Sequence, residues 1–354
     1  MIANVLAAFT PVVVFLILLV LMDSFKLARP SAIAKAIGWG IVAAIGCEAL
    51  YGWLAPALPL SAAGFSRYVA PLTEETAKAL FVAYLIRRRR IGFPVDAAQL
   101  GFAVGTGFAL VENVQYLRVL GNAGLLLWLV RGLGTAMLHG ATMAIFAMMA
   151  HTASERHPRR LVIVFAPAWL AAVVIHSAFN HVPLPPLAMT ALLLIALPAL
   201  VLAVFERSEV ATRDWVSAGL DLDLVMLEVF SSEGFAHTRF GRYLAELRDR
   251  FPGPVVADML CLLRVQLELS VQAKAAVMVR EAGVILPVHD DARHALEEVK
   301  YLRASIGTTA VLALQPFGVS SHRDDWHRYL LTGPDSRTLM GRWRLRGWRV
   351  SRKP

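Results

Sequence analysis

The sequence predicts an all-α polytopic membrane protein with about seven transmembrane helices, followed by a small, mainly helical cytosolic C-terminal domain. The chain has 354 residues, of which 57% are hydrophobic and only 17% are charged. Soluble proteins are rarely so apolar, and several uncharged runs are long enough to cross a bilayer. The charges are also divided unevenly, because residues 1–205 hold 14 Lys+Arg and 7 Asp+Glu whereas residues 206–354 hold 21 and 19. We therefore expect a membrane-embedded domain over 1–205 and a soluble domain over 206–354.

Seven segments in the first part approach the length of about 20 apolar residues that a membrane span needs. The third of them is short. They are residues 3–22, 37–56, 71–86, 97–117, 126–150, 161–182 and 186–205. The start of the chain has no basic n-region and no small-residue cleavage site, so we interpret it as a retained span and not as a removed signal peptide.

The basic residues alternate between the loops, which predicts the orientation in the membrane. Lys and Arg gather in residues 26–35, 87–90 and 156–160, after the first, third and fifth spans. The N-terminus is therefore expected outside and the C-terminal domain in the cytosol, in a multi-pass protein of the cell (inner, cytoplasmic) membrane. The net charge of +9 is explained by these loops, so we expect a lipid bilayer and no nucleic acid as partner.

Two further patterns concern packing and the C-terminal region. In the fourth span, Gly101 and Gly105 form a small-xxx-small pair that favours the close approach of another helix. Beyond Phe205, helical periodicity predicts helices over 235–250, 254–282 and 290–305, with a break at Phe251-Pro252-Gly253-Pro254. The basic, tryptophan-containing tail at 341–349 suits either anionic lipid headgroups or a disordered end. No phosphate loop, metal-ligand cluster or nucleophile motif stands out in this domain.

The third span opens with two carboxylates and a lysine, although it is otherwise apolar. An ionised side chain in hydrocarbon costs roughly 3 kcal/mol, so such residues usually pair or take part in function. Glu74 and Lys78 are four residues apart, which predicts an ion pair on one helix face. Glu75 is turned about 100° away and has no partner in its own helix. The partner of Glu75 is therefore expected on another span.

The other spans offer polar residues at a similar depth. Glu112 with Asn113, His139, and His176 with Asn180 lie on the fourth, fifth and sixth spans. Counted at about 1.5 Å per residue, Glu75, Glu112 and His176 all lie in the outer half of the bilayer. These positions predict one polar chamber open to outside water. Structural roles are expected for three others, namely helix packing for Glu48, snorkelling or pairing with a glutamate for Arg131, and solvation for His181.

Three functions are compatible with such a chamber. A carboxylate can act as a general base on water, and imidazole or amide groups can stabilise an oxyanion, which together describe a peptide hydrolase. Two His and a carboxylate also suit zinc, although no His-Glu-x-x-His spacing occurs. The alternative is a proton- or ion-coupled transporter, which also uses membrane Glu and His but often has internal repeats that are not evident here. A non-enzymatic sensor is the third class.

Four short motifs carry a resemblance to a known family. They are Glu74-Glu75-Thr76-Ala77-Lys78, Phe108-Ala109-Leu110-Val111-Glu112-Asn113, His139-Gly140 and His176-Ser177-Ala178-Phe179-Asn180. In this order and placement they resemble the PrsW family of membrane proteases, related to the type II CAAX prenyl endopeptidases. The resemblance covers roughly residues 70–182 and does not extend to the C-terminal domain.

The resemblance implies a glutamic-type intramembrane endopeptidase in which the Glu pair activates water. The catalytic residues would be Glu74, Glu75, Glu112, His139, His176 and Asn180, with Lys78, Phe108 and Asn113 in support. Glu75 would be the base or its closest partner. The substrate would be a membrane-anchored protein, such as an anti-sigma-factor-like regulator, cut from the extracytoplasmic side. No cofactor is favoured, and if a metal is bound, zinc on Glu75, His139 and His176 is the expected site.

Overall fold

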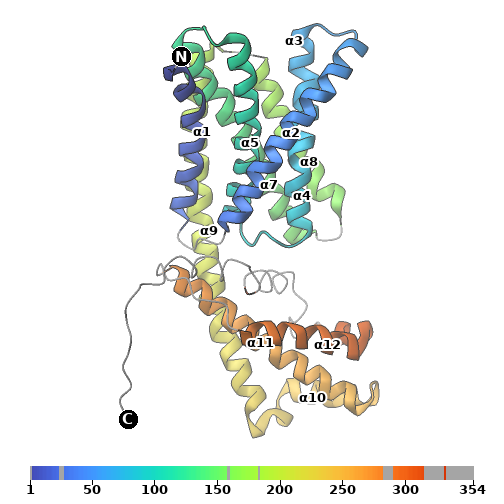
Figure 1. The fold of residues 1–354 in the computed structure, drawn as a ribbon. Helices are drawn as coiled ribbons and strands as arrows, with labels where there is room; N and C mark the ends of the chain where they lie inside the picture. Colours follow the sequence, from blue (N-terminus) through green and yellow to red (C-terminus); the bar gives the residue numbers. More distant parts are fainter. Residues whose placement is uncertain are drawn as a thin grey trace, which may run out of the picture. The chain divides into compact units, whose positions relative to one another are not determined.

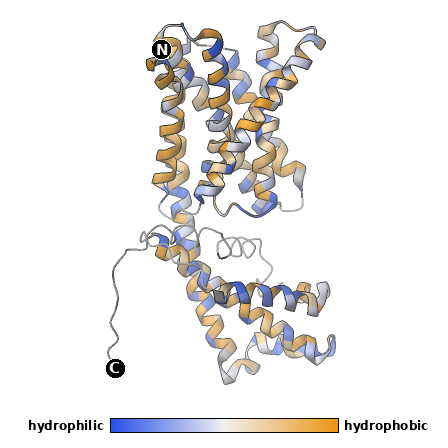
Figure 2. Cartoon of the chain, viewed as in Figure 1, coloured by the Kyte–Doolittle hydropathy of each residue, from blue (hydrophilic) through white to orange (hydrophobic). Residues whose placement is uncertain are grey.

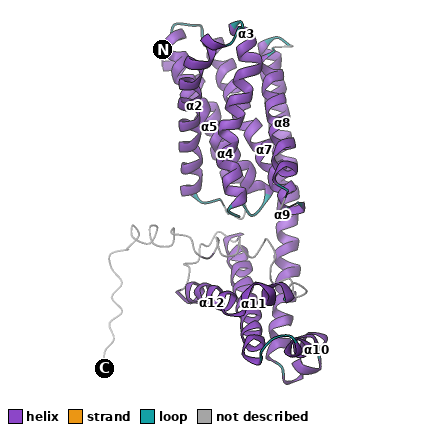
Figure 3. Cartoon of the chain, turned by 90° about the vertical axis from the view of Figure 1, so that its right-hand side faces the viewer, coloured by secondary structure: helices purple, strands orange, loops and turns teal. Residues whose placement is uncertain are grey.

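The computed structural model describes residues 2–23, 28–157, 160–181, 184–281, 290–314 and 331, and every regular element in these ranges is a helix (Figures 1 and 3). The predicted all-α class is therefore confirmed. The chain divides into two compact units, Met1–Asp214 and Trp215–Pro354. The basic tail at 341–349 lies outside the described residues.

Unit 1 is a bundle of long helices that lie side by side (Figures 1 and 3). Each predicted span falls wholly or largely within one of its helices, and the fifth span is a continuous run of α6, a π-helical segment and α7. The main elements are α1 (Ile2–Met22), α2 (Pro30–Ala57), α4 (Ala70–Arg87), α5 (Pro94–Leu120), α6 (Leu125–Val130), η2 (Arg131–Thr135), α7 (Ala136–Arg156), α8 (Leu161–Asn180) and α9 (Pro186–Ser231), with α3 (Ala62–Gly64) and the π-helical η1 (Phe65–Val69) before α4.

Within the described residues, six helices are long and apolar enough to cross a membrane when α6, η2 and α7 count as one. Helix α4 is the exception among the seven predicted spans. It has 18 residues and carries four charged ones, Glu74, Glu75, Lys78 and Arg87. It nevertheless packs against α2, α5, α7 and α8, and its two glutamates and lysine are buried. These charged side chains are therefore surrounded by other helices of the bundle and do not face lipid.

The surface of unit 1 is apolar, as expected for a multi-pass membrane protein. Large hydrophobic side chains such as Trp53, Val119 and Ile195 are 80%, 81% and 72% exposed. The bundle helices are predominantly hydrophobic along their length (Figure 2), whereas carboxylates, imidazoles and a lysine are buried within. This inverts the pattern of a soluble protein, because hydrocarbon and not water is the solvent of the outer face.

Helix α5 forms the centre of the bundle, between α2 and α7. Its small residues allow this position. A Cβ atom built on Gly101 would overlap the main chain of Met143, and one built on Gly105 would overlap that of His139. The predicted small-xxx-small contact is thus confirmed, and its partner is α7. The close approach brings His139 of α7 directly against α5.

Unit 2 contains the last part of α9, η3 (Glu233–His237), α10 (Arg239–Glu246), η4 (Leu247–Asp249), α11 (Gly253–Glu281) and α12 (Asp290–Ala313). The break at 251–252 is confirmed. The predicted helix over 235–250 begins instead at Arg239, after a 3-10 turn capped by Thr238. The helix of the seventh span does not end near Phe205, because no proline occurs between Pro198 and Pro252 to stop it. Helix α12 passes 305 with a kink at Gly307, whose φ is 75°.

Hydrogen bonds between side chains and neighbouring helices hold unit 2 together around a core of leucine, valine and alanine. Tyr243 of α10 donates to the Ala313 carbonyl at 2.8 Å, and Ser305 of α12 donates to Asp258 of α11 at 2.7 Å. Buried residues such as Leu262, Leu296 and Leu302 face the inside. The prediction of a small helical C-terminal unit therefore agrees with its described part.

Candidate active site

A cavity of about 790 Å³ opens within unit 1. Its walls come from seven of the bundle's helices, with α2, α4, α5 and α8 among them, and much of the lining is apolar. Five of the predicted site residues line it, and they are Glu74, Phe108, Glu112, His176 and Asn180. Glu75, Lys78 and His139 lie next to these residues and are 0%, 0% and 1% exposed. The structure therefore brings the polar residues of four helices together, as expected for one polar chamber.

The ion pair of α4 differs from the prediction. Lys78 Nζ contacts Glu75 Oε1 at 2.6 Å, with both side chains fully buried, so the predicted pairing with Glu74 is wrong. Residues three and four apart share a helix face, and sequence spacing alone does not choose between them. Neighbouring helices decide, because Lys78 Nζ also lies 3.1 Å from His139 Nδ1 and 4.6 Å from the centroid of the Phe108 ring. Glu74 is thereby left without a cation from its own helix.

The partners of His139 determine its tautomer. A lysine ammonium has only protons to donate, so Nδ1 of His139 accepts from Lys78. The ring proton of the neutral imidazole is then on Nε2, which donates to Glu112 Oε2 at 2.9 Å. The ring packs on Phe108, with 5.0 Å between the centroids. His139 is thus fixed between α4 and α5 with the lone pair of Nδ1 on the side of α4.

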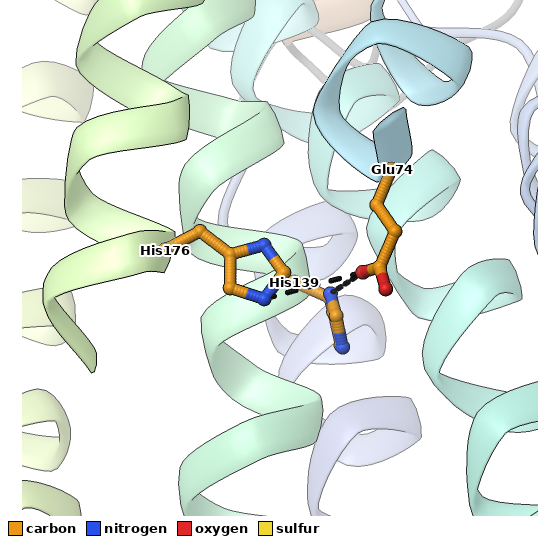
Figure 4. Close-up of side chains that lie close together, drawn as sticks. All are labelled: Glu74, His139 and His176. Atoms are coloured by element: carbon orange, nitrogen blue, oxygen red, sulfur yellow. Dashed lines mark ion pairs between the residues drawn. The ribbon is translucent and has the colours of Figure 1, made fainter. Parts of the chain in front are cut away.

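His176 is oriented in the same way by the other glutamate of the pair. Its Nδ1 donates to Glu75 Oε1 at 2.7 Å, so the lone pair of Nε2 is directed away from Glu75. Nε2 of His176 and Nδ1 of His139 lie 4.0 Å and 3.9 Å from Glu74 Oε2. Figure 4 displays this convergence of the two imidazoles on Glu74. One nitrogen of each ring therefore lies about 4 Å from the same carboxylate oxygen, and Nδ1 of His139 also accepts from Lys78.

These three side chains have the properties of a metal site. One ligand atom from each of Glu74, His139 and His176 lies within 4.8 Å of the others. Glu74 Oε2 is buried and has no hydrogen-bond partner among the described residues, although a buried carboxylate oxygen normally has one. Each imidazole also donates its other N–H to a carboxylate, which is the usual support of a metal-bound histidine. Three protein ligands at the edge of a cavity fit catalytic zinc, which keeps one position open.

The carboxylate of this set differs from the sequence-based expectation. The sequence predicts Glu75 as the metal ligand beside the two histidines. In the structure, Glu75 forms an ion pair with Lys78 and accepts a hydrogen bond from Nδ1 of His176. Glu74 instead lines the cavity and lies about 4 Å from one nitrogen of each histidine. The two adjacent glutamates point about 100° apart on the helix. Glu74 therefore reaches the cavity, whereas Glu75 lies outside its lining and holds His176.

A second group of polar residues holds Glu112. Arg131 Nη2 lies 3.2 Å from Glu112 Oε2, which confirms that this arginine pairs with a glutamate. Its Nε donates to Asn113 Oδ1 at 3.2 Å, and its guanidinium lies 3.4 Å from the centroid of the Tyr116 ring. Asn113 itself donates to the Ala8 carbonyl at 2.7 Å. Asn113 therefore supports Arg131 from outside the cavity, and Arg131 neutralises the carboxylate that holds His139.

The remaining predicted residue and two others complete the cavity. Asn180 lies one helical turn from His176, and its amide donates to the Ser66 carbonyl at 2.9 Å. Its oxyanion role stays a prediction. Glu48 lines the cavity, and Gln115 of α5 donates to it. Tyr51 is not among the predicted site residues, yet its hydroxyl donates to Glu74 Oε1 at 3.0 Å. The only sequence signal was a hydroxyl near the outer end of an apolar span.

One of three comparisons with known proteins finds a match. The description "PrsW family intramembrane metalloprotease" belongs to the family profile that matches residues 28–205, half of the chain. The matched region contains all four motifs, whereas the relation to the CAAX prenyl endopeptidases stays a prediction. No curated protein and no solved structure matches the chain. With a profile match over half its length and a buried Glu–His cluster in a membrane helix bundle, the chain belongs to the PrsW family of intramembrane metalloproteases.

Proposed function

We propose that this protease hydrolyses a peptide bond of a membrane-anchored protein in the cavity lined by Glu74, Glu112 and His176. One observation carries the proposal. Glu74 Oε2 is buried, has no hydrogen-bond partner among the described residues, and lies about 4 Å from an imidazole nitrogen of each of two other helices. Such an arrangement is costly without a cation or a reactive water between the groups. Transport is not retained as the alternative, because the family to which the chain belongs is a protease family.

We further propose that a divalent metal, with zinc as first choice, is held by Glu74, His139 and His176. The sequence favoured no cofactor, but the ligand cluster and the family description both favour a metal. Zinc bound at such a site lowers the pKa of a bound water to about 7 and polarises the substrate carbonyl. In the metal-free alternative, Glu74 itself takes the proton from water.

The surrounding residues have defined tasks under this proposal. Glu75 accepts the Nδ1 proton of His176, and Glu112 accepts the Nε2 proton of His139, so the nitrogen of each imidazole that lies nearer Glu74 carries no proton. Lys78 and Arg131 each neutralise one of these two carboxylates. Lys78 keeps Glu75 as its partner whether or not Nδ1 of His139 is occupied. The result is a set of ligands fixed before substrate enters, which is the condition for efficient electrostatic catalysis.

The position of the site along α4 supports cleavage near the extracytoplasmic face. Glu74 lies near the start of α4, and the four arginines Arg87–Arg90 follow at its end. Thirteen residues of helix separate Glu74 from Arg87, which is about 20 Å at about 1.5 Å per residue. Basic residues favour the cytoplasmic side, so we propose that the site lies on the opposite side, with the N-terminus outside. Unit 2 would then be the cytosolic domain.

The first test is a cleavage assay on the full-length protein, purified in detergent, with a panel of tagged single-span peptides. Wild type, Glu74→Gln and His176→Ala are compared with and without a chelator, and zinc is then added back. We expect wild-type cleavage that the chelator abolishes and zinc restores, and no cleavage by either variant. Cleavage that ignores the chelator but needs Glu74 would favour the metal-free route. Equal cleavage by wild type and Glu74→Gln would contradict the proposed site.

A further inference from the structure

We propose that Tyr51 is a positioning residue for Glu74, and that its hydroxyl holds one carboxylate oxygen so that the other faces the two imidazoles. The inference rests on the proposed metal site and extends it to a residue of α2 that none of the four family motifs contains. Tyr51 lines the same cavity as Glu74. It lies more than 20 residues before Glu74 in the sequence, so only the fold brings the two together.

The ring of Tyr51 is held in place independently of its hydroxyl. It packs edge-on against Phe65 of η1, with 5.1 Å between the centroids and 87° between the planes. The hydroxyl lies 3.0 Å from Glu74 Oε1, 2.8 Å from Thr73 Oγ1 and 3.3 Å from the Ala70 carbonyl. Three groups at the start of α4 thus surround one phenol oxygen.

The available protons assign the hydrogen bonds. Thr73 has acceptors for its proton within its own helix turn, the carbonyls of Val69 at 2.9 Å and Ala70 at 3.0 Å. Tyr51 also has one proton, and among its neighbours the carboxylate of Glu74 is the strongest acceptor because it is charged. Tyr51 therefore donates to Glu74, and its hydroxyl is the hydrogen-bond donor to Oε1 within the described part of the chain.

This hydrogen bond gives the two carboxylate oxygens of Glu74 different surroundings. Oε1 is taken by Tyr51, whereas Oε2 has no hydrogen-bond partner in the described chain and faces His139 and His176. The terminal torsion of a glutamate is broad and roughly two-fold, so a carboxylate without a fixed oxygen samples many orientations. Removal of the hydroxyl would therefore leave the ligand present but poorly oriented. Loss of such outer support typically costs about 10–100-fold in metal affinity.

A purely structural role for Tyr51 makes a different prediction, and the chain offers a matched control for it. Tyr51 also ties α2 to α4, but so does Trp39, whose Nε1 donates to the Ala77 carbonyl of α4 at 3.0 Å. The bond from Trp39 joins the same two helices without contacting Glu74. Trp39→Phe therefore loosens the helix pair and leaves the carboxylate held, whereas Tyr51→Phe keeps the ring and releases the carboxylate.

The experiment measures zinc affinity of the full-length protein in detergent, by competition with a chromophoric chelator, together with the thermal unfolding of the metal-free protein. We expect Tyr51→Phe to bind zinc about 10–100-fold more weakly than wild type, with Trp39→Phe within about two-fold. We expect Tyr51→Phe to unfold no earlier than Trp39→Phe. In a Glu74→Gln background, the further change Tyr51→Phe is expected to alter zinc affinity less than about two-fold, because the two residues act as one unit.

The outcomes separate the two proposals. Zinc binding by wild type with unchanged affinity in Tyr51→Phe would overturn the role of Tyr51 and leave the metal site intact. An equal loss in Trp39→Phe would show that the helix pair, and not the carboxylate, is responsible, and would also overturn it. A wild-type protein that binds no zinc would overturn the metal site and this role of Tyr51 together.

Discussion

Each of the two units buries a lysine beside a carboxylate, and the surroundings of the two pairs differ. In unit 1, Lys78 lies 2.6 Å from Glu75, and both partners make further contacts with histidines of other helices. In unit 2, Lys274 of α11 lies 2.5 Å from Asp223 of α9, and a Cβ on Gly219 would meet the end of its side chain. The first pair orients imidazoles beside a cavity, whereas the second joins two helices.

The comparison indicates which buried charges mark a functional site. A buried ion pair on its own is weak evidence of function, because many such pairs only connect elements of the fold. In unit 1, the pair is accompanied by a neighbouring carboxylate oxygen without a hydrogen-bond partner in the described chain and by two imidazole nitrogens about 4 Å from that oxygen. The unsatisfied groups around a pair, and not the pair itself, therefore point to chemistry.

The largest effect is expected from Glu74→Gln, which removes the carboxylate but keeps its shape. Peptide cleavage should fall by about 10²–10⁴-fold, the range typical of a lost catalytic proton-transfer or ligand group. Protein level and melting temperature should be nearly unchanged, since Gln can still accept from Tyr51. The measurement is the rate of single-span peptide cleavage. Cleavage at the wild-type rate would show that Glu74 is an ordinary buried carboxylate without a role in the reaction.

Mutation to methionine is expected to affect cleavage at Lys78 but not at Lys274, although both changes lower stability. Each change leaves a buried carboxylate without its lysine, and breaking a buried ion pair in this way typically destabilises a protein by about 3–5 kcal/mol. Lys78→Met should also abolish cleavage, because Glu75 no longer holds His176 correctly. Lys274→Met should lower the stability of unit 2 while the folded fraction keeps its zinc affinity.

Removal of both partners tests the same contrast in the opposite direction. Lys274→Met combined with Asp223→Leu should recover most of the lost stability, since a well-packed apolar pair can replace a buried ion pair. Lys78→Met combined with Glu75→Leu should recover stability without cleavage. Thermal unfolding and cleavage are measured on the same preparations, and recovery of cleavage in the second double variant would contradict an orienting role for Glu75.

A smaller effect is expected at Gly105, where α5 approaches α7. Gly105→Ala should force the helices apart at the His139 carbonyl and cost about 1–3 kcal/mol, as overpacking of a close contact does. Cleavage should fall along with stability because His139 moves. Gly38→Ala on α2 is the control, since a Cβ there meets no atom within 4 Å. Equal unfolding temperatures for the two variants would argue against the close α5–α7 contact.

The smallest effect is expected at the edge of the cavity. Glu48 and Gln115 contact each other between α2 and α5, where Glu48 is exposed and Gln115 is half-buried. Gln115→Ala should change stability by less than about 0.5 kcal/mol, because its contact with Glu48 lies at the exposed surface, where substitutions usually have small effects. Cleavage should stay within about two-fold of wild type. A large loss would mean that this contact belongs to the site and that exposure is a poor guide here.

The sequence predicts the helices and the set of polar residues well, for a physical reason. Long apolar runs leave few alternatives to helices, and charges within them are costly enough to gather in one place. Glu74, Glu112 and His176 accordingly line one cavity. The choice between Glu74 and Glu75 as the partner of Lys78 could not be made, because both spacings share a face and helices α7 and α8 decide it.

Tyr51 and the extent of α9 could not be predicted for a different reason. A tyrosine near the end of an apolar span is ordinary, and its contact with Glu74 depends on how α2 packs against α4. The sequence changes from apolar to amphipathic after Phe205, but this change does not end α9, because a helix can continue from lipid into water without a break. Composition indicates whether a segment lies in lipid or in water, but it does not indicate where its helix ends.

The central claim is that Glu74, His139 and His176 hold a metal at the cavity, and X-ray absorption at the zinc edge tests it most directly. The full-length protein is purified, loaded with one equivalent of zinc and compared with His176→Ala. We predict a zinc site with nitrogen and oxygen ligands at about 2.0–2.2 Å, including two imidazoles in wild type and one in the variant. An identical spectrum for both proteins, or a site with sulfur ligands, would contradict the account.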